Sequence, residues 1–276
     1  LLVGVGRGVL FLDGLELRAV RAGDLPLPLR LVEDDGCVGL KLVEDEEQRA
    51  EQHDEELHRD LEERVEHQAE PALAQSALAP RHRFPRGAVP GNFLHDQLEW
   101  LAGERFALAR DPELARRLGE RCERQGWGHR ADDVREWLGE VVTTPLPPAG
   151  VALDGLTTLL PELEFWLPTA GVNGTAIDAL CQQHLLSGRS RPVLGSRTLR
   201  GMLMGFADLV FEHGGRYWVL DYKSNALGAH DADYHREALA VAMAEHRYDV
   251  QAALYLLALH RLLRSRLRAA YEPARH

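Results

Sequence analysis

Two apolar segments joined by a glycine pair decide the fold of this chain. The first segment is Gly205-Phe206-Ala207-Asp208-Leu209-Val210-Phe211, and the second is Arg216-Tyr217-Trp218-Val219-Leu220-Asp221-Tyr222-Lys223-Ser224. Gly214-Gly215 lies between them and tolerates the positive φ angles of a two-residue type I′ turn. The pattern predicts a β-hairpin in which His213 pairs with Arg216, so that Asp208 lies opposite Asp221.

This register brings two carboxylates and one amine to the same face of the hairpin. Directly opposed Cβ atoms lie about 4.5–5.5 Å apart, where like charges repel unless a cation lies between them. Lys223 is two residues beyond Asp221, and the period-2 pleat puts both on one face. Oxygen ligands for Mg²⁺ beside an amine that orients or deprotonates water suit phosphodiester hydrolysis. The structural alternative is an exposed hairpin with a surface salt bridge.

Lysine is rare in this chain. Of the 32 basic residues 30 are arginine, and the two lysines are Lys41 and Lys223. The pKa of an amine can be lowered by its surroundings, whereas a guanidinium stays protonated. The scarcity therefore favours a chemical role for Lys223.

The negative charge is concentrated at the front of the chain. Residues 1–80 hold 19 acidic and 8 basic residues, which accounts for the whole net charge of −11, and the rest of the chain is balanced. Residues 44–70 are charged on nearly every side, which is typical of a solvated spacer. We predict an acidic N-terminal segment and linker over 1–80 and a folded domain over 81–276.

Helical and strand patterns alternate in the second part, which indicates a mixed α/β fold. Helices are expected over residues 93–109, 112–125, 131–141, 175–187, 232–245 and 248–267, and strands over 162–167, 205–211 and 216–224. No run approaches the roughly eighteen apolar residues of a membrane span. The start of the chain lacks the pattern of a signal peptide, and the three cysteines lie far apart without a Cys-x-x-Cys pair. We expect a cytoplasmic protein without a membrane segment.

Several separated motifs, taken together, resemble the nuclease domain of RecB from the bacterial RecBCD helicase–nuclease. Besides the hairpin, the matching blocks are Pro85-Arg86-Gly87-Ala88, Gly91-Asn92-Phe93-Leu94-His95, Arg200-Gly201-Met202-Leu203 and the segment from His246 to Arg261. The resemblance covers about residues 84–271. It implies a restriction-endonuclease-like fold of the PD-(D/E)XK type, with a mixed β-sheet flanked by helices.

The resemblance also assigns roles to residues. It implies that Asp208 and Asp221 bind the metal, that Lys223 is the catalytic lysine, that His95 is a further metal ligand and that Tyr222 offers its main-chain carbonyl. Four more residues are candidates for support or DNA contact: Glu99, Glu164, Gln251 and Tyr255. An ordinary role in solvation or helix packing is the alternative for each of these four.

The function implied is a Mg²⁺-dependent DNA exonuclease that acts in repair and recombination with helicase and RecC- or RecD-like subunits. The chain has no Gly-x-x-x-x-Gly-Lys-Ser/Thr phosphate loop, so we expect it not to unwind DNA alone. We also expect the domain to lack the last strand of the family's sheet. Two alternatives remain open: a catalytically inactive DNA-binding or docking module, and a stand-alone structure-selective nuclease.

Overall fold

The computed structural model describes residues 2–5, 8–11 and 78–276. The acidic segment predicted over residues 1–80 lies mostly outside the described residues, and its role as a spacer stays a prediction. Among the described residues, no helix combines the length and the hydropathy needed to cross a membrane.

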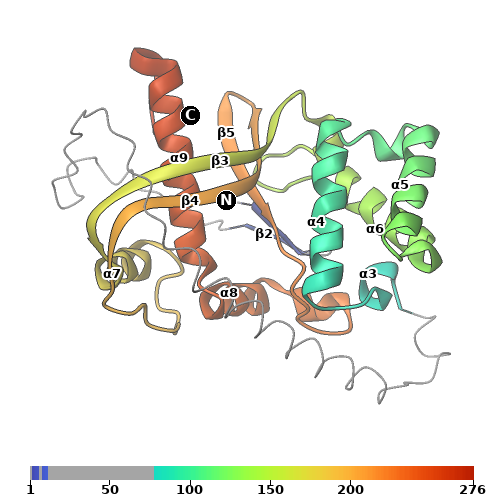
Figure 1. Ribbon diagram of the computed structural model, residues 1–276, viewed down its shortest axis with the longest axis horizontal. Helices are drawn as coiled ribbons and strands as arrows, with labels where there is room; N and C mark the ends of the chain where they lie inside the picture. The colour runs from blue at the N-terminus through green and yellow to red at the C-terminus, as the bar shows by residue number, and fades with distance from the viewer. Residues whose placement is uncertain (1, 6–7, 12–77) are drawn as a thin grey trace. The chain divides into compact units, whose positions relative to one another are not determined.

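The fold is built on a five-stranded mixed sheet in the order β2-β1-β5-β4-β3. The strands β3 (Thr158–Asn173), β4 (Thr198–His213) and β5 (Arg216–Tyr222) form an antiparallel unit (Figure 1). Two short strands that the sequence did not predict, β1 (Leu2–Val5) and β2 (Gly8–Phe11), continue the sheet, with β1 parallel to β5. The mixed α/β class is therefore confirmed.

The β4–β5 hairpin has the predicted register. Its five ladder pairs run from His213↔Arg216 to Leu209↔Leu220. Gly214 and Gly215 form the turn with φ values of +63° and +78°, a conformation that residues with a Cβ rarely adopt. The ladder ends one residue before Asp208 and Asp221, so the hairpin delivers both aspartates to the same end of the strand pair.

The helices follow the predicted pattern closely. The principal ones are α4 (Ala88–Gly103), α5 (Pro112–Arg124), α6 (Ala131–Thr143), α7 (Gly174–His184), α8 (Arg236–Glu245) and α9 (Tyr248–Leu267). Local chemistry fixes several starts. For example, the Asp111 carboxylate accepts the Glu113 amide at 2.9 Å, and Pro112 occupies the first turn of α5.

Several expectations about helix boundaries are wrong: the helix expected over residues 93–109 ends at Gly103, and the one expected over 232–245 begins at Arg236. The first helix of the domain begins at Ala88 rather than at residue 93, because Pro90 is accepted in the first turn, where its missing N–H leaves no hydrogen bond unmade. The short helix α3 (Pro80–Arg83) lies at the predicted boundary between linker and domain, where no helix was expected. It packs onto the domain through Phe84, which is 3% exposed and contacts Phe93 and Trp127.

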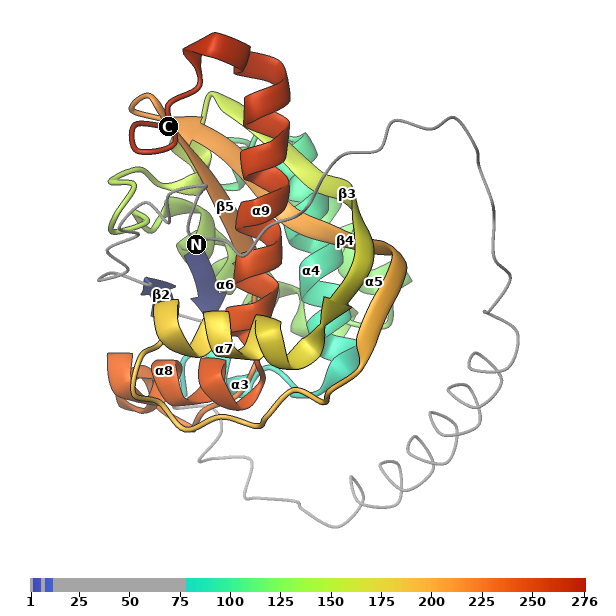
Figure 2. The same ribbon diagram turned by 90° about the vertical axis from the view of Figure 1, so that its left-hand side faces the viewer.

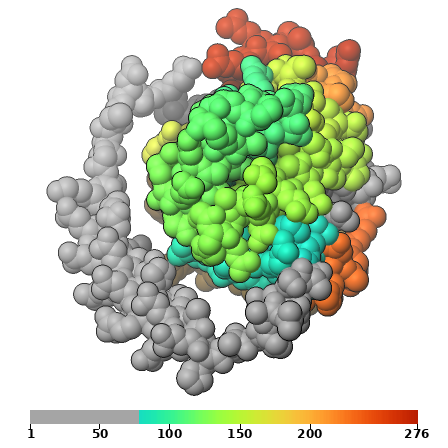
Figure 3. All heavy atoms as spheres, turned by 90° about the vertical axis from the view of Figure 1, so that its right-hand side faces the viewer, coloured from blue at the N-terminus to red at the C-terminus, as the bar shows by residue number. Residues whose placement is uncertain are grey.

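Two hydrophobic cores cover the two faces of the sheet. On one face, α4, α5 and α6 pack against Leu209, Phe211, Leu220 and Tyr222. On the other face, α9 packs Tyr255, Ala258, Leu259 and Leu263 against residues of all three antiparallel strands. Figure 2 shows α9 and α4 on opposite sides of the strands, and Figure 3 looks onto the helical block of residues 80–150. The open end of the β4–β5 hairpin, opposite its turn, thus lies between the layer of α4–α6 and the layer of α9.

Candidate active site

The predicted acidic and basic residues meet where β4 and β5 stop pairing. The Asp208 Oδ2 atom accepts the backbone N–H of Tyr222 at 2.5 Å, which holds this carboxylate against the end of β5. Lys223 Nζ lies 2.5 Å from Asp221 Oδ2, and both side chains are largely buried. The placement of Asp221 and Lys223 on one face agrees with the period-2 argument from the sequence.

The carboxylate of Asp208 is in an unfavourable environment for a negative charge. Burial, followed by repulsion from Asp221, raises its pKa from 3.8 to about 7. The hydrogen bond from Tyr222 and the charge of Lys223 act in the opposite direction but are weaker. Near neutral pH the negative charge of the Asp208 and Asp221 carboxylates therefore exceeds the positive charge of Lys223.

His95 on α4 lies at the same place from the other layer. Its Nδ1 atom lies 3.7 Å from Asp208 Oδ2, and its ring meets the ring of Tyr222 edge-on at 5.9 Å. Burial lowers the pKa of His95 below its ordinary value of 6.5, and the ammonium of Lys223 adds to this effect. The imidazole is therefore neutral at physiological pH, which is the form that binds metals.

The helix α9 supports the site from the opposite face. The Gln251 side-chain amide donates to the Tyr255 hydroxyl at 2.8 Å. Burial and then the charge of Asp221 raise the pKa of Tyr255. Lys223 Nζ also lies 4.4 Å from the centre of the Tyr248 ring, a cation–π contact that fixes the amine. Both Gln251 and Tyr255 are thus brought to the site.

The strand β3 contributes a carboxylate that sequence reasoning missed. Pro161 pairs with Leu209 and Leu163 with Ala207, but Glu162 between them has a φ of +46° and leaves the ladder. Glu162 is close enough to Asp208 to raise its pKa. The pKa of Glu99 on α4 is also raised, mainly by burial and then by Glu162.

Glu164, the acidic residue selected from the sequence, makes a different contact. Its Oε1 atom accepts the indole N–H of Trp166 at 2.7 Å on an exposed part of β3. The strand was correctly identified, but Glu162 is the β3 carboxylate that acts electrostatically on Asp208.

The donor set fits a divalent cation in its chemistry. It offers the carboxylates of Asp208 and Asp221, the neutral imidazole of His95 and the carbonyl of Tyr222, which are ligand types used for such ions. Asp221 is 3% exposed, and among the described residues its Oδ2 has no hydrogen-bond partner, Lys223 being its close charged contact. Within the part of the chain that the structure describes, however, no three His, Cys, Asp or Glu side chains are already arranged around a common ion position.

A comparison with known protein families shows to which family the domain belongs. Residues 72–274 match the PD-(D/E)XK nuclease superfamily. The chain belongs to this superfamily. The fold and the family expected from the sequence are thereby confirmed.

The superfamily members most similar to the chain include subunits of bacterial RecBCD enzymes. The RecBCD enzyme subunit RecB of Escherichia coli (strain K12) is 42% identical over 208 residues, which are 74% of this chain and 17% of that subunit. The corresponding subunit of Mycobacterium tuberculosis (strain CDC 1551 / Oshkosh) is 35% identical over 239 residues, 75% of this chain and 21% of the relative. The chain thus spans about a fifth of the length of these relatives and is a PD-(D/E)XK nuclease domain of the RecB type.

The contrast between Glu162 and Glu164 gives a direct test of how this nuclease site is built. We expect Glu162→Gln to raise the metal concentration needed for half-maximal cleavage by about three- to tenfold, because it removes a negative charge next to Asp208. Glu164→Gln is the matched control on the same strand and should stay within about twofold of the parent. Equal effects of the two substitutions in metal titrations of cleavage would contradict the assignment of Glu162 to the site.

Proposed function

We propose that the domain is a Mg²⁺-dependent deoxyribonuclease that degrades DNA strands from an end. The observation that carries this proposal is the convergence of Asp208, Asp221 and Lys223 at one end of a hairpin in a PD-(D/E)XK nuclease domain. Contact through the phosphate backbone would give little sequence preference.

In this proposal Asp208, Asp221, His95 and the Tyr222 carbonyl hold the ion. The bound cation would polarise the scissile phosphoryl group and neutralise charge that develops on it. Lys223 is held by Asp221 and by the Tyr248 ring, so its ammonium group is positioned to orient the attacking water. It would take the proton of that water only after giving up its own, which an amine can do. Gln251 and Tyr255 keep Asp221 in place from the side of α9.

We further propose that residues 81–276 act in the cytoplasm on strands delivered by a helicase, in a complex with RecC- and RecD-like subunits. The support is the similarity to subunits that are named as parts of RecBCD enzymes. Co-purification of the chain with helicase subunits would support this arrangement, and its absence together with activity of the isolated chain would favour a stand-alone nuclease.

Replacement of Lys223 tests the catalytic proposal. Lys223→Ala should lower cleavage of linear single-stranded DNA by about 10²- to 10⁴-fold, because general acid–base or orienting groups contribute on this scale. Lys223→Arg should not restore activity, since a guanidinium remains protonated. The only other lysine in the sequence supplies the control, Lys41→Ala, which should retain activity.

Two outcomes would overturn the proposal. Unchanged cleavage by Lys223→Ala would remove the lysine from the reaction. A folded parent protein without Mg²⁺-dependent cleavage would instead favour the inactive docking module.

Resistance of circular single strands distinguishes attack at ends from internal cleavage.

A further inference from the structure

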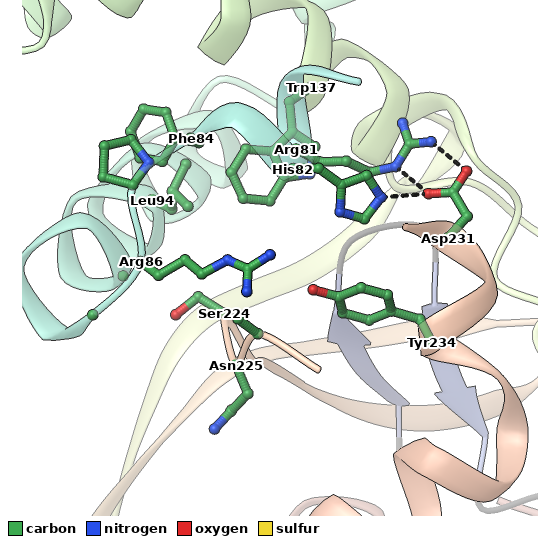
Figure 4. Close-up of a pocket in the computed structure, with 14 residues that line it drawn as sticks. Arg81, His82, Phe84, Arg86, Leu94, Trp137, Ser224, Asn225, Asp231 and Tyr234 are labelled. Atoms are coloured by element: carbon green, nitrogen blue, oxygen red, sulfur yellow. Dashed lines mark hydrogen bonds and ion pairs between the residues drawn. The ribbon is translucent and has the colours of Figure 1, made fainter. Parts of the chain in front are cut away.

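A pocket opens next to the active site at the N-terminal end of α4 (Figure 4). It encloses a cavity of about 80 Å³, and its lining includes Arg86, Gly87, Trp137, Ser224 and Tyr234. This space accommodates several water molecules and hence an anion of the size of phosphate. Ser224 directly follows Lys223 in the chain, so the pocket adjoins the catalytic residues.

Arg86 supplies a positive charge that no carboxylate of the described residues offsets. Its Nη2 atom donates to the Gly228 carbonyl at 2.6 Å, and the side chain is otherwise exposed. Figure 4 shows the guanidinium reaching across the pocket between Trp137 and Ser224. Arg81 on the pocket wall differs, because Asp231 and Glu140 both pair with it. Arg86 therefore keeps most of its donors for a ligand.

The N-terminus of α4 adds further donors. Gly87 is the N-cap residue with a φ of +121°, no side chain of the described residues caps the helix, and no acidic residue lies in the first turn. The first amides of a helix lack intrahelical acceptors, and the helix dipole favours an anion there. Gly91, which also lines the pocket, lies four residues before His95, a rise of about 6 Å along the helix.

Two buried nitrogen atoms at the pocket lack partners within the described part of the chain, and one of them, the indole N–H of Trp137, points to a missing acceptor. His82 has a side chain that is 5% exposed; its Nε2 contacts Asp231 at 2.7 Å, but its Nδ1 has no hydrogen-bond partner within the described part of the chain. The indole N–H of Trp137 is likewise buried and unpartnered there. Because an indole N–H can only donate, its environment calls for an acceptor atom.

We propose that this pocket binds a phosphate of the DNA strand that neighbours the scissile phosphate. Arg86, the first amides of α4 and the Ser224 hydroxyl hold it, and Arg86 is a positioning residue that sets the register of the strand. The identity of the ligand as DNA rests on the proposed function, whereas the presence of an anion site rests on the pocket itself.

Binding without metal tests the site separately from cleavage. Arg86→Gln in the full chain should weaken binding of a short fluorescent single-stranded oligonucleotide in EDTA by about ten- to a hundredfold, as expected for a lost charged hydrogen bond. The slope of log affinity against log salt should fall by about 0.7, the value for one phosphate contact on a single strand. Arg110→Gln is the control, because Arg110 is also exposed and donates to a backbone carbonyl, that of Asp154 at 2.9 Å.

Cleavage kinetics distinguish positioning from a structural role. Arg86→Gln should raise KM by a similar factor and leave kcat within about threefold, with partial rescue by Arg86→Lys and an unchanged melting temperature. Inorganic phosphate should compete with the oligonucleotide on the parent protein and lose this effect on Arg86→Gln.

Modified oligonucleotides identify the source of the phosphate. If the pocket takes an internal phosphate, one neutral methylphosphonate linkage beside the cleavage position should abolish the difference between the parent and Arg86→Gln. If the pocket takes a terminal phosphate, removal of the 5′-phosphate should abolish that difference instead. Equal affinities of parent and Arg86→Gln would overturn the phosphate site even if the protein cleaves DNA. An Arg86-dependent affinity in a protein that does not cleave would retain the site and reject the nuclease proposal.

Discussion

An Asp208→Asn protein is expected to be inactive and yet more stable than the parent at pH 8. The Asp208 pKa of about 7 means that folding places a charged carboxylate where it is disfavoured. Asparagine has nearly the same shape and still accepts the Tyr222 amide, but it carries no charge. Loss of a proposed metal-binding carboxylate should lower cleavage by roughly a thousandfold, or about 4 kcal/mol of transition-state stabilisation.

The gain in stability should depend on pH in a defined direction. Since the pKa of Asp208 is raised on folding from 3.8 to about 7, the parent is relatively more stable below pH 4 and loses that stability as the pH rises to 7. The difference between Asp208→Asn and the parent should therefore be near zero at pH 4 and on the order of 4 kcal/mol at most above pH 7.

Urea unfolding at several pH values, without and with Mg²⁺, measures these effects. Mg²⁺ should stabilise the parent, because a ligand that binds only the folded state favours it, and should stabilise Asp208→Asn far less. Asp132→Asn, at a carboxylate with 88% of its side chain exposed, is the control. It should change neither the pH dependence of unfolding nor the stabilisation by Mg²⁺. Full cleavage by Asp208→Asn would exclude a role for this carboxylate in the reaction.

Asp249→Ala is expected to destabilise the domain by about 3–5 kcal/mol, a large part of the total stability of an ordinary domain. Asp249 is fully buried and pairs with Arg191 at 2.5 Å and with Arg247 at 3.1 Å. Arg191 is 1% exposed and also donates to the Leu185 carbonyl at 2.9 Å. Removal of the carboxylate leaves two guanidinium groups in a protein interior without their shared partner.

The network joins parts of the chain that lie far apart in sequence. Arg247 reaches Asp178 on α7 at 2.8 Å, so the loss of Asp249 should loosen both α7 and the start of α9. Thermal and urea unfolding would show the loss. The control Asp132→Ala removes a first-turn acid of α6 whose pair with Arg135 is exposed, and it should cost less than about 1 kcal/mol. Similar midpoints for the two variants would contradict the importance of the buried network.

The hairpin could be predicted because its information is local. The glycine pair fixes the turn, the turn fixes the register, and the register brings Asp208, Asp221 and Lys223 to one end. His95, Gln251 and Tyr255 were proposed through resemblance to a family, since no period or spacing connects residues on different helices to a strand.

Glu162 could not be predicted because its position depends on the pairing of β3 with β4. That register is set across a long connection that contains α7, and not by a tight turn. Alternation would place Glu162 and Glu164 on the same face, but the positive φ at Glu162 interrupts the pleat. The pocket around Arg86 was equally hidden, since its lining comes from segments far apart in the sequence.

The position of the site between two hydrophobic cores makes its geometry sensitive to both. His95 is anchored by the layer of α4, whereas Tyr255 is anchored by α9, and the ends of β4 and β5 lie between them. A small slip of either helical layer would separate the imidazole from the carboxylates while leaving each core intact. We therefore expect cleavage by this domain to depend on the alignment of its layers and to be lost before the fold itself.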